Sequence, residues 1–340
     1  MCDGGALGVA TSLRSLLLAG AALFAASSAA NADMGLAPAG PGNVYLSGEG
    51  GYLLQDGLDV NAYGVSFLPG SVADATVSAD DGWYAGVMIG WEKGSRLISF
   101  LPFTRVEGYV YGGDTNGSRA DSAPPLANVT IKSVDGLVNV TGGTSVQATT
   151  DRRTVEFGYR SEFDQIYSPS FAITWGLNSF FRNTNEDTDV ICSNVCGVRR
   201  SANVDSWMYG TMLVAEPEFK IQPGISLVTR FGAGLYTYDA DGEFRSSSSS
   251  TASPDPFAAA VDDSDKGVGF RGALGAGLKF VLGTNALLET YAEADYFSDV
   301  GVAQFSNSNP TDAASSQVNT EDLWELRTGA RVTIGLGGGN

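Results

Sequence analysis

The sequence of 340 residues has no histidine and little charge, since Asp, Glu, Lys and Arg together make up 17% of it. Without histidine, the chain lacks the side chain that titrates nearest neutral pH, which excludes histidine-based acid–base catalysis and nucleophile activation. The formal net charge of −18 argues against nucleic acid as a partner, because such binding needs Lys and Arg to displace counterions. A mean hydropathy of +0.00 fits neither a disordered chain nor a bundle of transmembrane helices.

Long apolar runs are missing from all but the N-terminal part of the chain. Arg14 is followed by an apolar run at 15–26, and the tripeptide ANA at 30–32 suits cleavage directly behind it. The run is shorter than the ~20 residues that a membrane helix requires. We therefore predict a cleaved export signal at 1–32, followed by a short lead at 33–42.

Cysteine is also scarce, and only Cys192 and Cys196, in the segment CSNVC, follow the predicted signal. In an exported protein such a close pair predicts a small disulfide, which loop entropy would make worth about 2 kcal/mol. A metal or redox site at the pair is the alternative. The absence of histidine and of a third thiol in the exported chain disfavours it.

The exported part is instead rich in period-two alternation, which recurs about ten times and predicts β-strands. In WYAGVMIGW, residues 83–91, one face carries Trp83, Val87, Ile89 and Trp91. No charged residue interrupts the apolar rows, whereas the alternate positions carry Glu, Arg, glycine and tyrosine. Alternation alone does not distinguish a soluble sandwich from a membrane barrel.

Connector length separates these two folds. Short turns on one side and long loops on the other are typical of a bacterial outer-membrane barrel, whereas a Greek-key sandwich does not sort its loops in this way. The strands, at about ten or more residues, also exceed the ~5–6 residues of soluble strands. We predict short links at Lys93–Arg96, Asp164–Ser168, Gln222–Gly224 and Gly283–Asn285, and long loops at 55–80, 113–150, 183–205, 239–265 and 299–320.

Tryptophan placement agrees with a membrane span. Trp83 and Trp91 lie about 26 Å apart along a strand that rises ~3.3 Å per residue. With a tilt of ~40°, their separation along the membrane normal is about 20 Å, near the height of the apolar band that aromatic girdles border. We predict an aromatic girdle formed by Trp83, Trp91, Trp175, Trp207 and Trp324.

The export signal, the alternating strands, the short turns opposite long loops and the glycine-rich inner face together resemble the outer-membrane β-barrel proteins of Gram-negative bacteria. The resemblance, of OmpA-barrel or porin-like architecture, covers about Val44 to Leu336. It implies an all-β fold, a single antiparallel transmembrane β-barrel of about ten strands at 43–336 with a tail at 337–340. It also implies a place in the cell outer membrane, both chain ends in the periplasm, and outer-membrane lipids and lipopolysaccharide as partners.

The inward positions carry a nearly balanced set of acidic and basic side chains, which predicts mutual pairing, because unpaired charge in a narrow lumen is costly. Paired charges close a lumen, and small barrels are normally filled by their own side chains. We therefore predict a structural or surface-interaction barrel. Inward glycines such as Gly86, Gly158 and Gly277 open space and keep a passive, cation-preferring pore as the alternative. The predicted network comprises Glu49, Glu107, Glu156, Arg160, Glu216, Arg230, Arg271, Glu289, Glu293, Arg327 and Arg331.

Carboxylates offer the remaining route to an enzyme. Glu289, Glu293 and Asp295 share one inner face at spacing two, where acid–base chemistry is conceivable. Pairing with Arg327 and Arg331 on the next strand is the favoured interpretation. We predict no enzyme activity and no cofactor.

The predicted long loops are acidic, which suits divalent cations that bridge to lipopolysaccharide phosphates. Residues 127–150 alternate as strands do, which predicts a hairpin above the membrane. Such a hairpin folds either inward as a plug or outward toward an extracellular partner.

Overall fold

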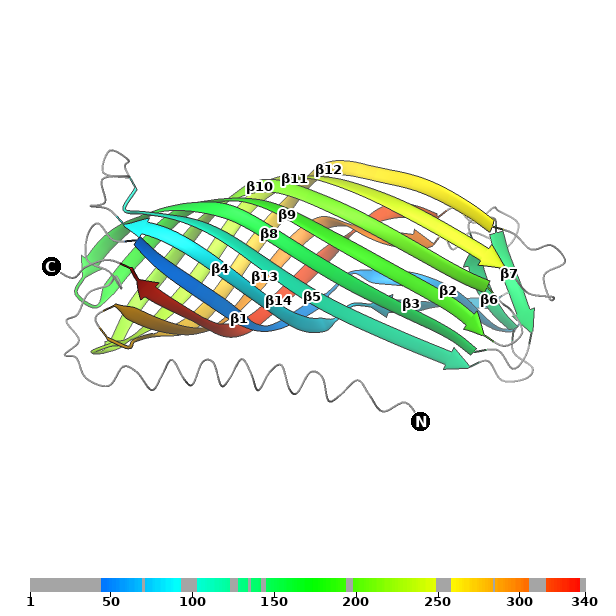
Figure 1. The fold of residues 1–340 in the computed structure, drawn as a ribbon, viewed down its shortest axis with the longest axis horizontal. Coiled ribbons are helices and arrows are strands. Elements are labelled where there is room, and N and C mark those ends of the chain that lie inside the picture. The colour runs from blue at the N-terminus through cyan, green and yellow to red at the C-terminus, as the bar shows by residue number, and fades with distance from the viewer. Residues whose placement is uncertain are drawn as a thin grey trace.

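The computed structural model describes residues 44–68, 71–92, 103–122, 128–133, 136–141, 145–193, 198–248, 258–283, 285–305 and 316–336. All regular elements within these ranges are β-strands (Figure 1). The predicted export signal, lead and tail lie outside the described residues. In the described part of the chain, no helix is long and apolar enough to cross a membrane.

Ten antiparallel strands form a closed barrel in the order β1-β14-β13-β12-β11-β10-β9-β8-β5-β4, and β1 also pairs with β4 (Figure 1). Closure satisfies the backbone groups of the wall internally, as a sheet in a membrane requires. The predicted single antiparallel barrel is confirmed. Its strands are β1 (Val44–Asp56), β4 (Asp81–Glu92), β5 (Arg105–Ser122), β8 (Ser145–Ser168), β9 (Phe171–Ser193), β10 (Val198–Gln222), β11 (Ile225–Ser248), β12 (Ala258–Val281), β13 (Ala286–Phe305) and β14 (Ser316–Gly335).

Short connections join β8 to β9, β10 to β11 and β12 to β13 at one end of the barrel, called here the short-turn end. In the second of these turns Gly224 has a φ of 78°, a left-handed conformation that glycine adopts without strain. The predicted link at Asp164–Ser168 is wrong, because these residues belong to β8 and the turn follows at Pro169 and Ser170. The predicted link at Lys93–Arg96 lies outside the described residues.

The strands are longer than predicted. β8, β9, β10, β11 and β12 have 24, 23, 25, 24 and 24 residues, and they occupy much of the predicted loops 113–150, 183–205 and 239–265. Likewise, β13 and β14 extend into the predicted loop 299–320. The loop predictions are wrong there because the apolar outer rows end while backbone pairing continues.

A second, four-stranded sheet has the order β3-β2-β6-β7, formed by β2 (Asp59–Leu68), β3 (Ser71–Ser78), β6 (Asn128–Ser133) and β7 (Gly136–Thr141). The β6–β7 hairpin confirms the hairpin predicted within 127–150. The predicted long connection at 55–80 is confirmed, because it joins the neighbouring barrel strands β1 and β4, and the β2–β3 hairpin forms within it. The end of β1 leads into this hairpin through Gly57, whose φ of 104° turns the chain away from the barrel wall.

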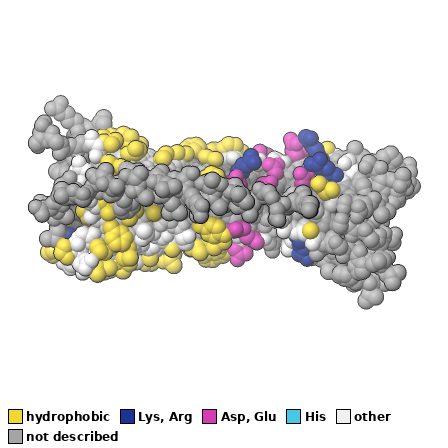
Figure 2. All heavy atoms as spheres, turned by 60° about the horizontal axis from the view of Figure 1, so that its bottom comes forward, with side chains coloured by type: hydrophobic (Ala, Val, Ile, Leu, Met, Phe, Trp, Pro, Cys, Tyr) yellow, Lys and Arg dark blue, Asp and Glu magenta, His cyan; other side chains and the backbone are white. Residues whose placement is uncertain are grey.

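The outer face of the barrel is apolar toward the short-turn end. The side chains of Val87, Leu213 and Leu274 are 54%, 69% and 58% exposed. Such apolar surface is unfavourable in water, but it is not unfavourable against the lipid chains of a bilayer. Figure 2 shows hydrophobic side chains over this half of the molecule, with Asp, Glu, Lys and Arg gathered beyond them. We call the apolar part the belt.

Aromatic side chains border the belt on both sides. At the edge farther from the short turns, the ring centroids of Phe181 and Trp207 are 5.2 Å apart and those of Tyr296 and Trp324 are 4.9 Å apart. Trp83 is exposed at the same edge. Near the short turns, the rings of Tyr167, Phe171 and Phe219 stack in succession at 5.5 and 4.6 Å. Of the other two predicted girdle residues, Trp175 is exposed opposite Phe163, and Trp91 is half-buried opposite Val44.

Beyond the far edge of the belt the strands form an extension whose outer face is polar. Asn185 donates a hydrogen bond to Asp205 at 2.8 Å across β9 and β10, and Asp239 accepts one from Lys266 at 2.8 Å across β11 and β12. The Asp239 carboxylate raises the pKa of Lys266 above its usual value through this bond. The same strands therefore change from a lipid-facing to a water-facing outer surface along their length.

Candidate functional site in the barrel lumen

The inner face reverses polarity in the opposite sense, so the lumen holds polar groups inside the belt and apolar groups inside the extension. At the level of the belt, acidic and basic side chains meet in the lumen, some from neighbouring strands and some, as in the Arg182–Glu325 and Arg271–Glu156 pairs, from distant parts of the wall. We call them the ion-pair stack. It consists of Glu49, Glu156, Arg160, Arg182, Glu216, Arg230, Arg271, Glu289, Glu293, Asp295, Glu325, Arg327 and Arg331.

The half of the stack nearer the short turns is built around Arg230 and Arg331. Arg230, on β11, contacts Glu216 of β10 at 2.5 Å and Glu293 of β13 at 2.6 Å, so it reaches one neighbouring strand and, past β12, a second one. Arg331 contacts Glu49 at 2.7 Å and Glu289 at 3.5 Å. Each guanidinium therefore has at least two carboxylate partners, which offsets much of the desolvation cost of its burial.

The other half of the stack is buried more deeply. Arg271 contacts Glu156 at 3.0 Å and Asp295 at 3.3 Å, while Arg182 contacts Glu325 at 2.5 Å and Glu156 at 3.6 Å. Arg327 completes this half through Glu293, at 3.3 Å, and Asp295. Aromatic faces cover the cations here, with Phe297 4.4 Å from the Arg182 guanidinium and Phe180 4.5 Å from that of Arg271.

The structure places ten of the eleven predicted network residues in the stack and the remaining one, Glu107, nearer the short turns. Glu107 accepts a hydrogen bond from the Tyr45 hydroxyl. Sequence reasoning missed Arg152 and Glu186, a buried pair 2.5 Å apart that Gln55 joins at 3.2 Å from Arg152. They were missed because they lie at the belt's end, where the apolar rows stop. The signal was nonetheless present, since each continues an inward row at spacing two.

The inward glycines do not widen the lumen as predicted. Several of them lie beside tyrosine rings that cover the wall, so that a Cβ on Gly90 would meet Tyr45 and one on Gly158 would meet Tyr109. In the same way, a Cβ on Gly329 would meet the Tyr84 hydroxyl. Glycine on one strand thus makes room for an aromatic ring from another strand, and the lumen is filled rather than opened.

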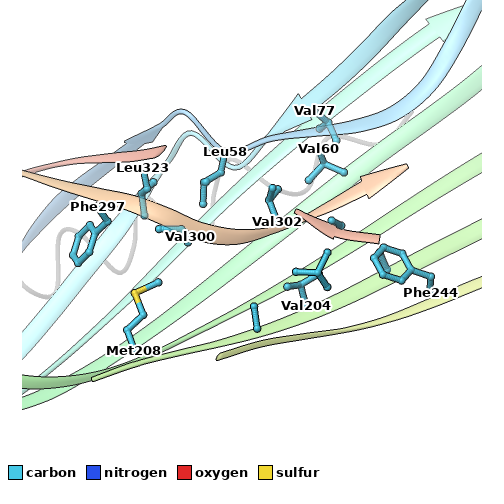
Figure 3. Packing of buried hydrophobic residues seen from close by; sticks show 14 of the residues in the cluster. Leu58, Val60, Val77, Val204, Met208, Phe244, Phe297, Val300, Val302 and Leu323 are labelled. Carbon is cyan, nitrogen blue, oxygen red and sulfur yellow. The ribbon is translucent and has the colours of Figure 1, made fainter. Parts of the chain in front are cut away.

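Inside the extension, the lumen is filled by a cluster of buried apolar side chains, called here the apolar plug. Part of it comes from the β2–β3 and β13–β14 hairpins. Figure 3 shows Val300 and Val302 of β13 between Leu58 and Val60 on one side and Val204 on the other. The cluster comprises Leu58, Val60, Val77, Ala148, Phe180, Val190, Ala202, Val204, Met208, Tyr236, Ala240, Phe244, Phe297, Val300, Val302, Ala303, Val318 and Leu323.

A backbone irregularity aims the β13–β14 hairpin into the lumen. The pairs between β12 and β13 end at Arg271 and Phe297, whereas β12 itself continues back to Ala258. The register of β13 shifts between Phe297 and Val300, where Asp299 has a φ of 61°, a conformation costly for a residue other than glycine. The bulge turns β13 out of the wall, and Val300 and Val302 become buried.

A cavity of about 140 Å³, called here the vestibule, lies between the ion-pair stack and the short turns. Its walls carry carboxylates such as Glu92, Glu107 and Glu162 together with Arg105, which contacts Glu162 at 2.9 Å. A second cavity, of about 250 Å³, lies beside the β8–β9 and β10–β11 turns. The ion pair of Glu218 and Lys279 lines both this cavity and the vestibule. Both of these spaces lie at the short-turn end of the lumen.

The three carboxylates considered for catalysis are all engaged by arginine. Glu289 contacts Arg331, and Glu293 and Asp295 contact Arg327. Among the described residues, no group of three or more His, Cys, Asp or Glu is placed to hold a metal ion. For the predicted disulfide, Cys196 and the side chain of Cys192 lie outside the described part of the chain, so the bond stays a prediction.

No family model and no curated protein matches the sequence. Among solved structures it is similar to the outer membrane protease OmpT of Escherichia coli, at 9% identity and a TM-score of 0.46 over 87% of this chain and 98% of that one. It is also similar to the translocator domain of the autotransporter NalP from Neisseria meningitidis, at 12% identity and a TM-score of 0.36 over 94% of this chain and 96% of that one. A third similar structure is Ail, the attachment invasion locus protein of Yersinia pestis, at 12% identity and a TM-score of 0.21 over 86% of this chain and 99% of that one.

None of these three TM-scores reaches 0.5, so the fold rests on the chain's own ring of strands. At the level of the belt, that closed ring is apolar outside, polar inside and bordered by aromatic side chains. The chain is an outer-membrane β-barrel. In bacteria, barrels of this construction belong to the outer membrane of Gram-negative cells, with short turns on the periplasmic side and the longer connections outside.

Proposed function

We propose that the protein is a non-conducting barrel with a structural or surface-interaction role in the outer membrane. The observation that carries the proposal is that two different fillings follow one another along the lumen. The ion-pair stack fills it at membrane level, and the apolar plug fills it above. An ion crossing the barrel would have to break buried ion pairs and then enter an apolar core, both at high cost.

The test is single-channel conductance of the purified protein, folded in detergent and inserted in a planar bilayer. We expect no conductance steps from protein whose insertion is established by protection from protease. Steady, reproducible steps would overturn the proposal in favour of the alternative, a passive pore for small polar solutes. The acidic vestibule would then predict cation preference, and reversing the charge at Glu216 should change that preference.

The polar outer face of the extension supports a surface role. Asp187, Asp189, Asp205 and Asp239 lie on this face, at or beyond the aromatic edge of the belt. We propose that divalent cations bridge these carboxylates to lipopolysaccharide phosphates, which would supply the remaining oxygen ligands. Retention of lipopolysaccharide during purification should then fall when a chelator is added. Equal retention with and without the chelator would contradict the bridging.

A further inference from the structure

One side of β12 has no strand beside it in the extension. The pairs between β12 and β13 end at Arg271 and Phe297, because β13 turns into the lumen, whereas β12 continues back to Ala258 beside β11. Among the described residues, no strand pairs with this side of β12 between Ala258 and Phe270. In Figure 1 this part of β12 follows the upper outline of the molecule. We call it the open edge.

Backbone groups point out of the open edge at every second residue. Two amide groups show which residues these are, since Phe270 N donates to the Ser298 hydroxyl at 2.8 Å and Lys266 N donates to the Asp265 carboxylate at 2.9 Å. Both bonds go to side chains and not to β11. Backbone groups two residues apart on a strand point to the same side, so those of Ser264 also point away from β11. Such a row is a template on which another extended segment can pair.

The side chains along the open edge are mostly acidic. Asp262 is exposed on the outer face, while Asp263 and Asp265 lie on the inner face. The one basic side chain of this stretch, Lys266, donates to Asp239 of β11 at 2.8 Å and so leans away from the edge. Lysine on an edge strand normally discourages pairing, and its engagement by β11 leaves carboxylates as the charge that an approaching segment meets.

The neighbouring strand strengthens this preference. Glu243 of β11 is the cross-strand partner of Asp262, and Asp241 is that of Ser264. Like charges directly opposite each other on a sheet destabilise it. A strand added at the open edge would place its own side chain beside Asp262 on the same face, and a basic side chain there would relieve the repulsion. Charge complementarity therefore selects a basic segment over a neutral or acidic one.

We propose that the open edge is a docking site for an extended segment of an extracellular protein that is rich in Lys or Arg. The segment pairs with β12 around Ser264 as a further strand, and its basic side chains lie beside Asp262. This docking rests on the surface-interaction role proposed above and gives that role a class of partner. It does not depend on whether the lumen is closed.

The test is binding of a fluorescein-labelled peptide of alternating Lys and Thr residues to the detergent-folded full-length protein, followed by fluorescence anisotropy. We expect saturable binding. Ser264→Pro should weaken it about tenfold or more, because proline removes an amide from the open edge while the pairing with β11 stays intact. Ser264→Ala keeps the amide, is the matched control and should bind as the parent protein does.

Asp262→Lys tests the same site without a change in the backbone. It should weaken binding about threefold or more, because it places like charges beside each other. Asp187→Lys makes the same change of charge at an exposed site of β9, three strands from β12. That distance is about 14 Å at ~4.8 Å per strand, beyond the ~8 Å over which charges act at about 0.15 M salt, so binding should be unchanged.

Three results would overturn the docking site. The first is the absence of saturable binding to the folded parent protein. The second is equal binding by Ser264→Pro and Ser264→Ala, which would mean that charge alone holds the peptide. The third is an equal loss in Asp187→Lys and Asp262→Lys, which would place the peptide on the acidic outer face at large. The conductance measurement is independent of all three, since current steps from protein that binds the peptide would refute the closed lumen alone.

Discussion

Arg182 illustrates how much of this barrel's stability depends on single buried charges. Its side chain has 0% exposure, and Glu325 lies 2.5 Å from it with 0% exposure as well. Glu325→Gln leaves the guanidinium with its longer contact to Glu156, and breaking a buried pair costs about 3–5 kcal/mol. We expect this loss in the free energy of unfolding, measured by urea titration of the protein folded into lipid vesicles.

Two comparisons separate the ion pair from simple loss of packing. The double variant Arg182→Met with Glu325→Leu should recover most of the stability, because it removes both charges together. Glu243→Gln breaks the ion pair between Glu243 and Arg245, whose side chains are 61% and 71% exposed respectively. Because the pair is exposed, this change should lower the free energy of unfolding by no more than about 1 kcal/mol. A Glu325→Gln variant as stable as the parent would contradict the role assigned to the stack.

The position of the membrane can be tested at a single residue of the belt. Val87 lies midway between Trp83 and Trp91 and faces outward. Val87→Arg should destabilise the barrel by about 2–4 kcal/mol, the cost of a basic side chain at the middle of the bilayer. Gln147→Arg, at an exposed site of β8 in the extension, should change stability by less than about 0.5 kcal/mol. Equal effects in the vesicle unfolding assay would show that the belt does not face lipid.

At the scale of whole elements, the sequence allowed the ring of strands and most of the stack to be predicted, because both depend on local alternation. The row from Glu156 to Arg160, for example, shows its inward face by spacing alone. The extension was mistaken for loops because the outer face becomes polar there, as at Asn185 and Asp205, while the inner face becomes apolar. A pattern that reverses polarity without changing period looks like the end of a strand.

The inward turn of the β13–β14 hairpin could not be predicted in this way. It depends on the left-handed conformation of Asp299 and on side chains from distant strands, such as Val60 and Val204, that receive Val300 and Val302. Those contacts are set by the tertiary structure. Period-two alternation alone describes the hairpin equally well as a continuation of the barrel wall.

The packing of this hairpin is open to direct measurement. Val302→Asn places an amide in the apolar plug, where an unsatisfied polar group costs about 1–3 kcal/mol. Backbone amides of 300–305 should then exchange with solvent roughly tenfold faster or more, as followed by hydrogen–deuterium exchange mass spectrometry. Gln304→Asn, at a half-buried site on the same strand, should leave exchange unchanged. Slow exchange in Val302→Asn would mean that the hairpin does not depend on the plug.

For the whole molecule, the two fillings of the lumen act as barriers in series, and this arrangement makes a prediction about conductance. Replacing residues 299–321 by a short Gly-Ser turn removes Val300, Val302, Ala303 and Val318 from the apolar plug but leaves the ion-pair stack intact. That variant should remain silent in a planar bilayer. Combining it with Arg182→Ala and Arg271→Ala removes two guanidinium groups from the part of the stack that borders the plug.

The combined variant should conduct, and the carboxylates Glu156 and Glu325 left without these partners should make the conductance cation-selective. The two arginine substitutions alone should stay silent, because the intact plug still fills the extension. Conductance from the hairpin replacement by itself would mean that the stack is loose enough for water and ions to pass. In that case the ion pairs would line a pore rather than close one, and the extension alone would hold the barrel shut.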